Sequence, residues 1–258
     1  MDGRFLSQPK VIEASRHFVC IRLLTYESKE EAKVIKSVFI GRSGDLENTV
    51  FALLTPEGET VGRAGRSPEQ VFEGPEALAA EMDRVAKAHP AKKGFSHELP
   101  VAKNIRLALN VAACDRLPLV VALHPQAEGL AKIEKTLNAA AWKEGVQGAF
   151  TYAVTSEAKE LASVQGLKAK SGILVIEPDA FGLKGTMLAE IPADASVEKV
   201  EQGLLKARAL HDAPPKDTRK QIEEARRTGI HWETEIPDTD PGPGPGRGAG
   251  SQQGSGPH

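Results

Sequence analysis

The stretch PLVVALH (residues 118–124) is the most strand-like run in this chain and the best guide to its fold. Five consecutive apolar residues, beginning at Leu119, predict a strand that is buried on both of its faces. The helical pattern AKNIRLALNVAACDRL precedes this run, and a second helical pattern, LAKIEKTLNAAAWKEG, follows it after the loop PQAEG. Strands that alternate with helices in this way predict an α/β protein with a central mixed sheet flanked by helices.

A pattern of strand, helix, strand, turn, strand and helix occurs twice, over about residues 17–89 and 148–211. The first copy reads HFVCIRLLTY, EEAKVIKSVF, NTVFALLTPEGETVGRAG and ALAAEMDRVAKAH; the second reads GAFTYAVT, SEAKELASVQGL, SGILVIEPDAFGLKGTMLAEI and VEKVEQGLLKARALH. The order and spacing agree although the residues differ, which is typical of a duplicated domain. In the first copy, FVCIRLL (residues 18–24) is predicted to be a buried central strand, and Ser28 with Glu31 has the pattern of a capping box.

Length and composition indicate a two-domain globular protein. The chain has 258 residues, of which 40% are hydrophobic and 26% are charged, and each of two domains would be large enough to hold its own core. A net charge of −2 gives no reason to expect a nucleic acid partner, and no run approaches the roughly 18 apolar residues of a membrane span. The opening residues MDGRFLSQPK do not have the apolar region of a signal peptide. As written, the sequence predicts a cytoplasmic protein that needs no cofactor.

The composition also changes along the chain, which sets the predicted domain boundaries. A first domain is predicted over residues 1–91 and a second over 99–212, with a polar linker at 92–98. A highly charged helix is predicted within residues 213–236, lying on the second domain. Glycine and proline dominate residues 237–258, which are predicted to be disordered because they offer almost no apolar surface to bury.

The second domain resembles a thioredoxin-like domain over about residues 99–211. PLVVALH is similar to the strand that leads into the active-site loop, where redox-active members carry W-C-x-x-C at a helix N-terminus. The corresponding stretch here is HPQAEG, so His124 and Pro125 occupy the loop and there is no sulfur. The family also has a cis-proline just before the next-to-last strand, facing that loop, and Ser171 or a neighbour takes this position. The resemblance therefore implies a fold without thiol chemistry.

The first domain resembles the same fold only from its middle onwards. RFLSQPKVIEASRHFVCIRL is similar to the segment that follows the CxxC helix in thioredoxin domains related to disulfide-interchange proteins, with Val11, Phe18, Val19 and Ile21 fitting the pattern. The resemblance places Thr49 or a neighbour at the cis-proline position and leaves the first βα unit outside the chain. Two explanations remain open. Either residues upstream of Met1 supply that unit, including a CxxC, or the fold is truncated and a partner replaces the strand.

The remaining candidate residues favour structural roles. Cys20 lies inside an apolar run and is interpreted as a core residue, since free cysteine is commonly buried. Cys114 lies near the C-terminal end of a predicted helix, where the helix dipole does not favour a thiolate, and it is interpreted in the same way. His124 has no second histidine, cysteine or paired carboxylate close in sequence, so it does not predict a metal site.

The sequence thus predicts a redox-inactive tandem thioredoxin-like protein that binds protein or peptide, without nucleic acid or a membrane span. The alternative is a thiol-disulfide oxidoreductase whose CxxC lies upstream of Met1, in which case the protein would be exported or periplasmic. The chain is an enzyme only in the second case. Its oligomeric state and specific partner are not indicated by the sequence.

Overall fold

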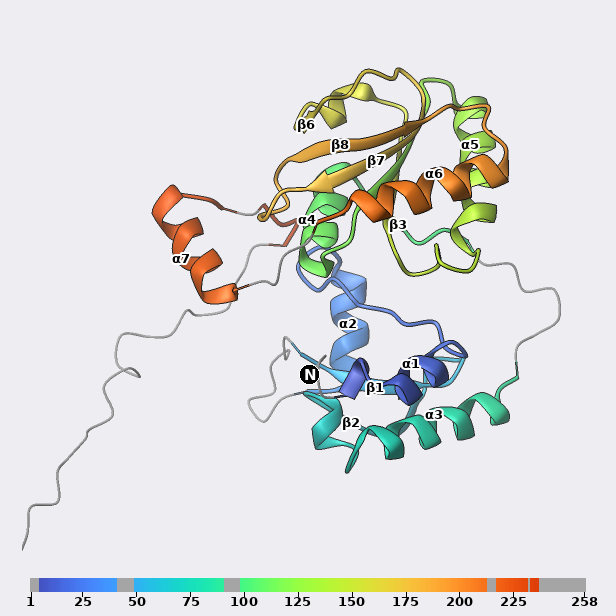
Figure 1. The fold of residues 1–258 in the computed structure, drawn as a ribbon. Helices are drawn as coiled ribbons and strands as arrows, with labels where there is room; N and C mark the ends of the chain where they lie inside the picture. The colour runs from blue at the N-terminus through green and yellow to red at the C-terminus, as the bar shows by residue number, and fades with distance from the viewer. Residues whose placement is uncertain (1–4, 41–48, 91–97, 213–216, 232, 237–258) are drawn as a thin grey trace, which may run out of the picture. The chain divides into compact units, whose positions relative to one another are not determined.

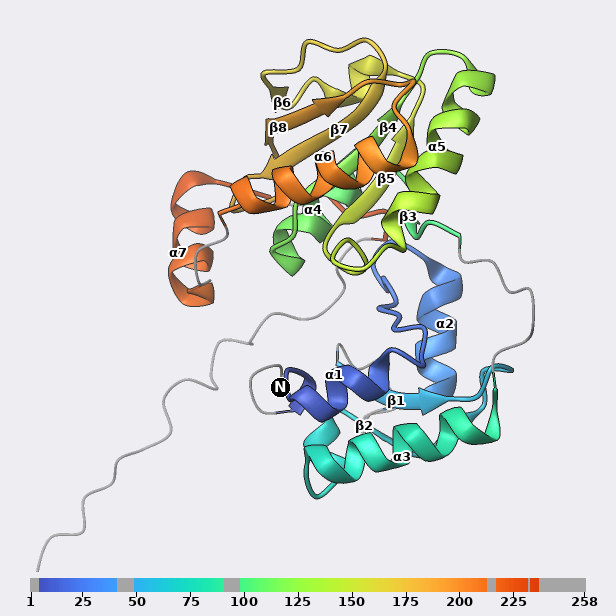
Figure 2. The same ribbon diagram turned by 45° about the vertical axis from the view of Figure 1, so that its right-hand side comes forward.

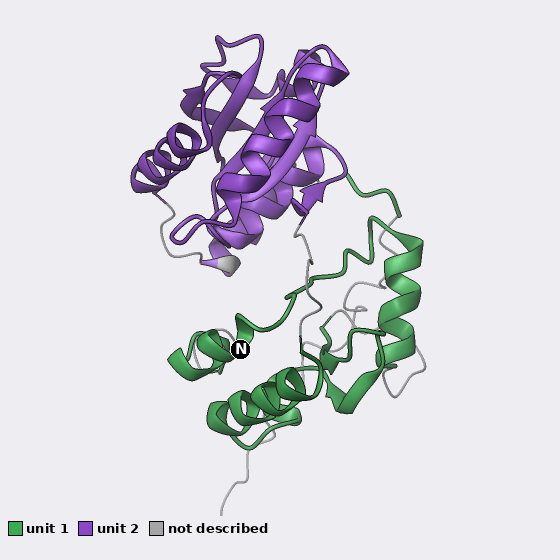
Figure 3. Ribbon diagram, turned by 90° about the vertical axis from the view of Figure 1, so that its right-hand side faces the viewer, with its two compact units in different colours: residues 1–93, 233–258 green, residues 94–232 purple. Residues whose placement is uncertain are grey.

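The chain divides into two compact units (Figure 3). Unit 1 comprises residues 1–93 and 233–258, and unit 2 comprises residues 94–232. The predicted tail at 237–258 and all but the last residue of the predicted linker lie outside the described residues. The computed structural model of the chain describes residues 5–40, 49–90, 98–212, 217–231 and 233–236.

Unit 2 contains a six-stranded mixed sheet with the order β3-β5-β4-β7-β8-β6, which confirms the predicted α/β class (Figures 1 and 2). β3 and β4 run parallel to β5, whereas β7 runs antiparallel to both β4 and β8. The short β6 runs parallel to β8 at the other edge. The strands are β3 (Val101–Ala102), β4 (Leu119–Leu123), β5 (Thr151–Thr155), β6 (Val164–Gln165), β7 (Gly172–Pro178) and β8 (Gly185–Ile191).

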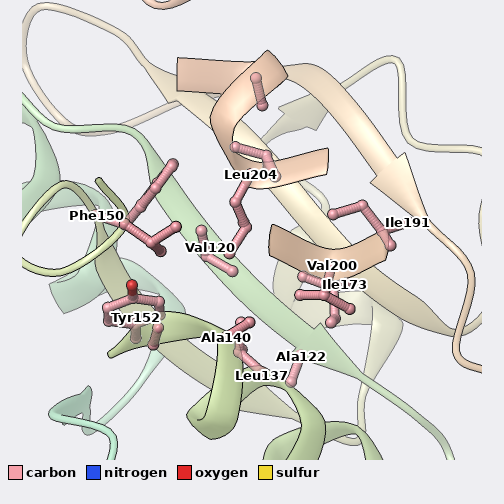
Figure 4. Packing of buried hydrophobic residues seen from close by; sticks show 14 of the residues in the cluster. Val120, Ala122, Leu137, Ala140, Phe150, Tyr152, Ile173, Ile191, Val200 and Leu204 are labelled. Carbon is pink, nitrogen blue, oxygen red and sulfur yellow. The ribbon is translucent and has the colours of Figure 1, made fainter. Parts of the chain in front are cut away.

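Helices cover both faces of this sheet. The cluster that α5 and α6 make with the sheet includes Leu137, Leu204 and the β4 residue Val120 (Figure 4). The cluster on the other face joins α4 to alternate residues of β4, among them Leu119 and Val121. All five residues of β4 are buried, as the uninterrupted apolar run predicts. The helices of unit 2 are α4 (Ile105–Asp115), α5 (Ala127–Ala141), η3 (Ala158–Leu161), α6 (Val197–Leu210) and α7 (Thr218–Thr228).

The predicted helix in SEAKELASVQGL is wrong. Residues 156–167 form only the single 3-10 turn η3, followed by the short strand β6. Leu161 and Val164 are buried against the α4 side of the sheet, and Val164 pairs with β8. Gly166 then adopts a positive φ of 84°, which is incompatible with a continuing helix. Pairing with β8 and burial on the sheet have therefore outweighed the local helical pattern.

The charged helix α7 belongs to unit 2 and is hydrogen-bonded to the turn between β7 and β8. Asp217 caps its first turn by accepting a hydrogen bond from the Lys220 N–H at 3.2 Å. The Gln221 side chain donates a hydrogen bond to the carbonyl of Ala180, in the turn between β7 and β8. Ala225 is buried, whereas Ile222 keeps 44% of its surface exposed. None of the helices in the described ranges is long and apolar enough to span a lipid bilayer.

Unit 1 is a smaller assembly around a two-stranded antiparallel sheet. Its core joins Val11 of α1 and Leu53 of β1 to Leu78 and Met82 of α3. The spacing of Leu78, Met82 and Val85 places one apolar face of α3 on this core, as the sequence predicts. The elements of unit 1 are α1 (Pro9–Ser15), α2 (Lys29–Val38), β1 (Phe51–Leu54), β2 (Thr60–Gly65), η2 (Pro68–Gln70) and α3 (Pro75–Ala88).

The prediction of a buried strand at residues 18–24 is wrong, because the segment belongs to no sheet in the described structure. Cys20 is exposed, which corrects its interpretation as a core residue. Val19 is 73% exposed and Ile21 is 62% exposed. A β-branched pattern favours a strand only where a neighbouring strand can pair with it, and this segment has none in the described structure.

Helix α2 begins with the predicted Ser28 cap but only half of the predicted capping box. The Ser28 side chain accepts a hydrogen bond from the Glu31 N–H at 3.2 Å. The Glu31 carboxylate reaches back to the Leu24 N–H, at 2.5 Å, rather than to the N–H of Ser28. This contact joins Leu24, at the end of residues 18–24, to the first turn of α2.

Candidate functional site

The candidate site in unit 2 lies at one edge of the sheet, where β4 and β5 end and β7 begins. In the strand register, Leu123 lies opposite both Thr155 and Gly172. His124 follows Leu123 and Ser171 precedes Gly172. These two residues therefore take the next opposed position beyond the last pair of the antiparallel β4–β7 ladder. The register therefore brings His124 and its exposed neighbour Pro125 to the same end of the sheet as Ser171, which lies 46 or more positions later in the sequence.

His124 is half-buried and folds back over the start of α5. Its backbone N–H donates to the carbonyl of Thr155 at 3.3 Å, which continues the β4–β5 pairing by one residue. Its Nδ1 atom lies 3.1 Å from the backbone N of Gln126 and 3.0 Å from the carbonyl O of the same residue. The Gln126 side chain makes no cap hydrogen bond of its own. The imidazole therefore contacts the backbone of Gln126, the residue immediately before α5, and no side chain caps the N–H groups of the first turn in the described structure.

Gly129 makes room for this imidazole in the first turn of α5. A Cβ atom at Gly129 would lie 2.1 Å from Cε1 of His124, far inside van der Waals contact. The ring thus occupies the space beside the first turn of α5. The arrangement gives His124 a structural role and leaves the exposed Pro125 at the surface of the loop.

The segment that precedes β7 is anchored from β8. The Glu190 carboxylate accepts hydrogen bonds from the backbone N–H groups of Lys168, at 2.7 Å, and Ala169, at 3.1 Å. Gly172 then enters β7 with a φ of 138°, and a Cβ atom there would lie 2.5 Å from the carbonyl O of Ile191. Only glycine fits this close backbone approach. The position of Ser171 is therefore fixed on both sides.

Ser171 does not have the proline of the resembled family, and no cis peptide bond occurs in the described parts of the chain. Lys170 and Ser171 make no hydrogen bond among the described residues, so their backbone groups remain available. Thr49 belongs to unit 1, where it is exposed and lies two positions before β1. Its assignment as the position in the first copy that corresponds to Ser171 stays a prediction from the sequence.

The two thiols lie in different units, and each is exposed. Cys114 lies in the last turn of α4 and is exposed, which corrects its interpretation as a core residue. Cys20 lies between α1 and α2 in unit 1, where desolvation raises the pKa of its thiol although the residue is exposed. A raised pKa lowers the thiolate fraction at neutral pH, so neither the position nor the electrostatics of Cys20 favours a nucleophile.

One histidine contact in unit 2 escaped the sequence interpretation. His211, at the end of α6, places Nδ1 2.7 Å from a carboxylate oxygen of Glu177 and Nε2 2.9 Å from the carbonyl O of Arg116. Because both ring nitrogens are engaged by protein oxygens, neither is available to act as a base on a substrate. The contact joins the ends of α6, β7 and α4, and a separation of 34 residues between His211 and Glu177 hid it from sequence reasoning.

Tyr152 on β5 buries a hydroxyl group that has no hydrogen-bond partner in the described structure. Its ring packs with Phe150 at a centroid distance of 6.4 Å, inside the cluster under α5 and α6. Burial raises the pKa of the Tyr152 hydroxyl, because the charged form would be far from water.

A shallow hollow lies beside the C-terminal end of β8. Polar side chains of both signs line it, including Glu190, Asp194, Lys199 and Lys206. Opposite charges on an open surface do not converge on one ligand, and the described residues contain no group of three or more potential metal ligands. Comparison with family models, with curated proteins and with solved structures finds no match to this chain.

Proposed function

We propose that this chain is a tandem thioredoxin-like protein without thiol chemistry, which binds protein or peptide segments. The observation that carries the proposal is the meeting of His124 and Ser171 at one edge of the sheet. In the resembled family, the active-site loop and the cis-proline loop face each other at this place. The succession of helix, β5, β7, turn, β8 and α6 supports the same assignment.

The lack of thiol chemistry follows from the residues at that edge. The loop HPQAEG contains no cysteine, and the His124 ring occupies the space beside the first turn of α5. Cys114 lies on α4, which packs on one face of the sheet rather than at this edge. Disulfide exchange needs an accessible thiolate beside the substrate, which this edge does not provide.

Binding is supported by the free backbone at the same edge. The N–H and carbonyl groups of Lys170 and Ser171 have no partner among the described residues, and the segment is held rigid by Glu190 and Gly172. An extended peptide can pair with such groups through its own backbone, while the side chains on either side of it provide selectivity. A preformed segment loses little conformational entropy on binding.

Two measurements test this proposal. In an insulin reduction assay with dithiothreitol, the chain should not accelerate turnover above the background; turnover that disappears in Cys20→Ser or Cys114→Ser would contradict the proposal. With reduced, carboxymethylated α-lactalbumin as an unfolded probe, amide exchange should slow at residues 166–171. Ser171→Trp should remove this protection, whereas Gln147→Trp, before the opposite end of β5, should keep it.

A second candidate function is thiol-disulfide exchange by a CxxC contributed by residues upstream of Met1. The observation that favours it is the exposure of Val19 and Ile21 in unit 1, although their pattern suits a buried strand. An upstream βα unit would supply both a neighbouring strand and the thiols. Translation of the DNA upstream of Met1, in frame and including a TGA codon, should then show W-C-x-x-C. A frame without this motif would exclude the second candidate.

A further inference from the structure

The C-terminal end of α6 is held by polar contacts rather than by apolar burial. Ala207 is the last buried residue of this helix, and residues 208–210 are all exposed. The Arg208 guanidinium donates a hydrogen bond to the carbonyl of Gly145 at 2.7 Å. His211 ends the helix: its backbone N–H donates to the carbonyl of Arg208 at 3.2 Å, and its ring contacts two other elements of unit 2. The order of this last turn therefore depends on how firmly His211 is bound.

Both ring nitrogens of His211 face oxygen atoms that accept hydrogen bonds. Nδ1 lies 2.7 Å from Oε2 of Glu177, near the end of β7, and Nε2 lies 2.9 Å from the carbonyl O of Arg116, immediately after α4. A carbonyl oxygen has no proton to donate, and neither has an ionised carboxylate. Both contacts are therefore hydrogen bonds only when the ring carries a proton on each nitrogen.

Loss of one proton changes this arrangement. A neutral imidazole has one N–H, so it cannot donate to both oxygens. Its other nitrogen would then face an oxygen lone pair at 2.7 or 2.9 Å, which is a repulsive contact. Carboxylates are ordinarily ionised between pH 5 and 8, and histidine is the side chain that ordinarily changes its charge in that range. The ring is thus the group whose proton completes the contact.

The contact between His211 and Glu177 is partly shielded from water. The two side chains keep 12% and 25% of their surface exposed. Water and salt screen such a pair less than they screen a pair on the open surface. Protonation of His211 should therefore affect the local structure more than protonation of an exposed histidine such as His231.

The neighbouring charged groups do not take the place of Glu177. The Asp179 carboxylate accepts hydrogen bonds from the backbone N–H groups of Phe181, at 3.2 Å, and Leu183, at 2.9 Å. The other charged side chains at the ends of the elements that meet here are Asp115 and Arg116 at the end of α4, Asp179 and Lys184 in the β7–β8 turn, and Arg208 and Asp212 at the end of α6. Because this set has carboxylates and cations in equal number, their charges offset one another. Glu177 is the carboxylate that is in contact with the ring.

We propose that His211, Glu177 and the carbonyl of Arg116 form a pH-sensitive clasp on the last turn of α6. With a proton on each ring nitrogen, the clasp joins the end of α6 to β7 and to the end of α4. As the pH rises from about 6 to about 8, the ring loses a proton, one contact is lost and the last turn opens more often. The clasp is therefore complete at acidic pH and weakens as the pH rises. It lies at the end of β7 away from Gly172, so the inference does not depend on the proposed peptide-binding edge.

Amide exchange of the full chain at pH 6 and pH 8 tests the clasp, with each rate divided by that of an unstructured chain at the same pH. Protection of residues 208–211 should be about tenfold lower at pH 8, since a hydrogen bond of a charged group is lost. Residues 200–204 should be protected equally at both pH values, because Val200 and Leu204 are fully buried. His231→Gln, at an exposed histidine of the same unit, should leave the tenfold difference intact.

Glu177→Gln separates the clasp from its pH dependence. An amide donates as well as accepts, so it can donate to Nδ1 of a neutral ring whose Nε2 N–H still binds the carbonyl of Arg116. Protection of residues 208–211 in this variant should stay high at both pH values. His211→Ala, which removes the ring, should give low protection at both. Thermal unfolding followed by circular dichroism shows whether the two variants fold.

Two results would overturn the inference. Equal protection of residues 208–211 at pH 6 and pH 8 in the unmodified chain would show a static contact, and this comparison needs no variant to fold. A tenfold difference that persists in Glu177→Gln would show that another group carries the pH dependence. Either result leaves the proposed function untouched, because peptide binding is measured at residues 166–171.

Discussion

Two stretches with a strand-like sequence pattern, one in each unit, differ in burial and in strand pairing. Residues 119–123 form β4, which pairs with a strand on each side and has every side chain buried. Residues 19–23 are apolar except for Arg22 and are β-branched in part, yet Val19 and Ile21 are 73% and 62% exposed. The difference shows that composition predicts the tendency to form a strand, while the presence of neighbours on both sides decides whether the strand is formed and buried.

The largest expected effect comes from placing a charge in each of these stretches. Val121→Asp puts a carboxylate into the core beneath α4 and should cost more than about 4 kcal/mol of unfolding free energy, enough to unfold unit 2. Ile21→Asp should change the unfolding free energy by less than about 0.5 kcal/mol, because the side chain is already in water. Urea denaturation followed by circular dichroism measures both. Similar costs at the two positions would show that residues 19–23 are buried in solution.

A cavity in the core of unit 1 should have the next largest effect. Leu78 is fully buried between α1 and β1, so Leu78→Ala should cost about 3 kcal/mol through lost apolar contact and the cavity that remains. Hydrogen exchange should show the loss in α1 and α3, with β4 unaffected if the units unfold separately. A cost below about 1 kcal/mol would mean that the core of unit 1 is loosely packed in solution.

Tyr152→Phe should stabilise unit 2 by about 1 kcal/mol near neutral pH, because it removes a buried hydroxyl that has no partner. Burial raises the pKa of this hydroxyl above its value in the unfolded chain, which is about 10. Above about pH 10 the unfolded chain ionises while the folded chain does not, so the stability of the native protein falls as pH rises. Urea titrations between pH 7 and 11 should show a shallower alkaline decline in the variant. An equal decline in both proteins would place the hydroxyl in contact with water.

The smallest effect concerns thiol access, which needs no change in stability. In a Cys114→Ser background, Cys20 should react fully with a thiol-specific reagent in the folded chain, because the residue is exposed. Its rate at neutral pH should rise when the chain is unfolded in urea, since desolvation raises the pKa of the folded thiol. A thiol that reacts only after unfolding would restore the interpretation of Cys20 as a core residue.

Sequence reasoning succeeded where local pattern and tertiary environment agree. The apolar run at residues 119–123 and the spacing of Leu78, Met82 and Val85 both describe the buried faces that the structure contains. It failed at residues 156–167, where a helical pattern met a strand partner in β8. It also failed at Cys20, because a sequence shows an apolar run without showing whether a second strand lies beside it.

The candidate site could be located from the sequence but not described in detail. The positions of His124 and Ser171 follow from their places before and after strands, and the register brings them to one edge. The packing of the His124 ring against the first turn of α5 could not be predicted, because it depends on the missing Cβ of Gly129 five positions later. The contact of His211 with Glu177 and the carbonyl of Arg116 joins three distant parts of the chain, and no local pattern signals it.

Gly172 has a consequence for how this edge can change during evolution. Replacing Gly172 with any other amino acid adds a Cβ atom, and a Cβ atom here would collide with the carbonyl O of Ile191. Ser171, one position earlier, has no such constraint within the described structure. Substitutions should therefore be tolerated at position 171 and selected against at position 172. Variation in the side chain beside the proposed binding edge would then occur next to a glycine that stays the same.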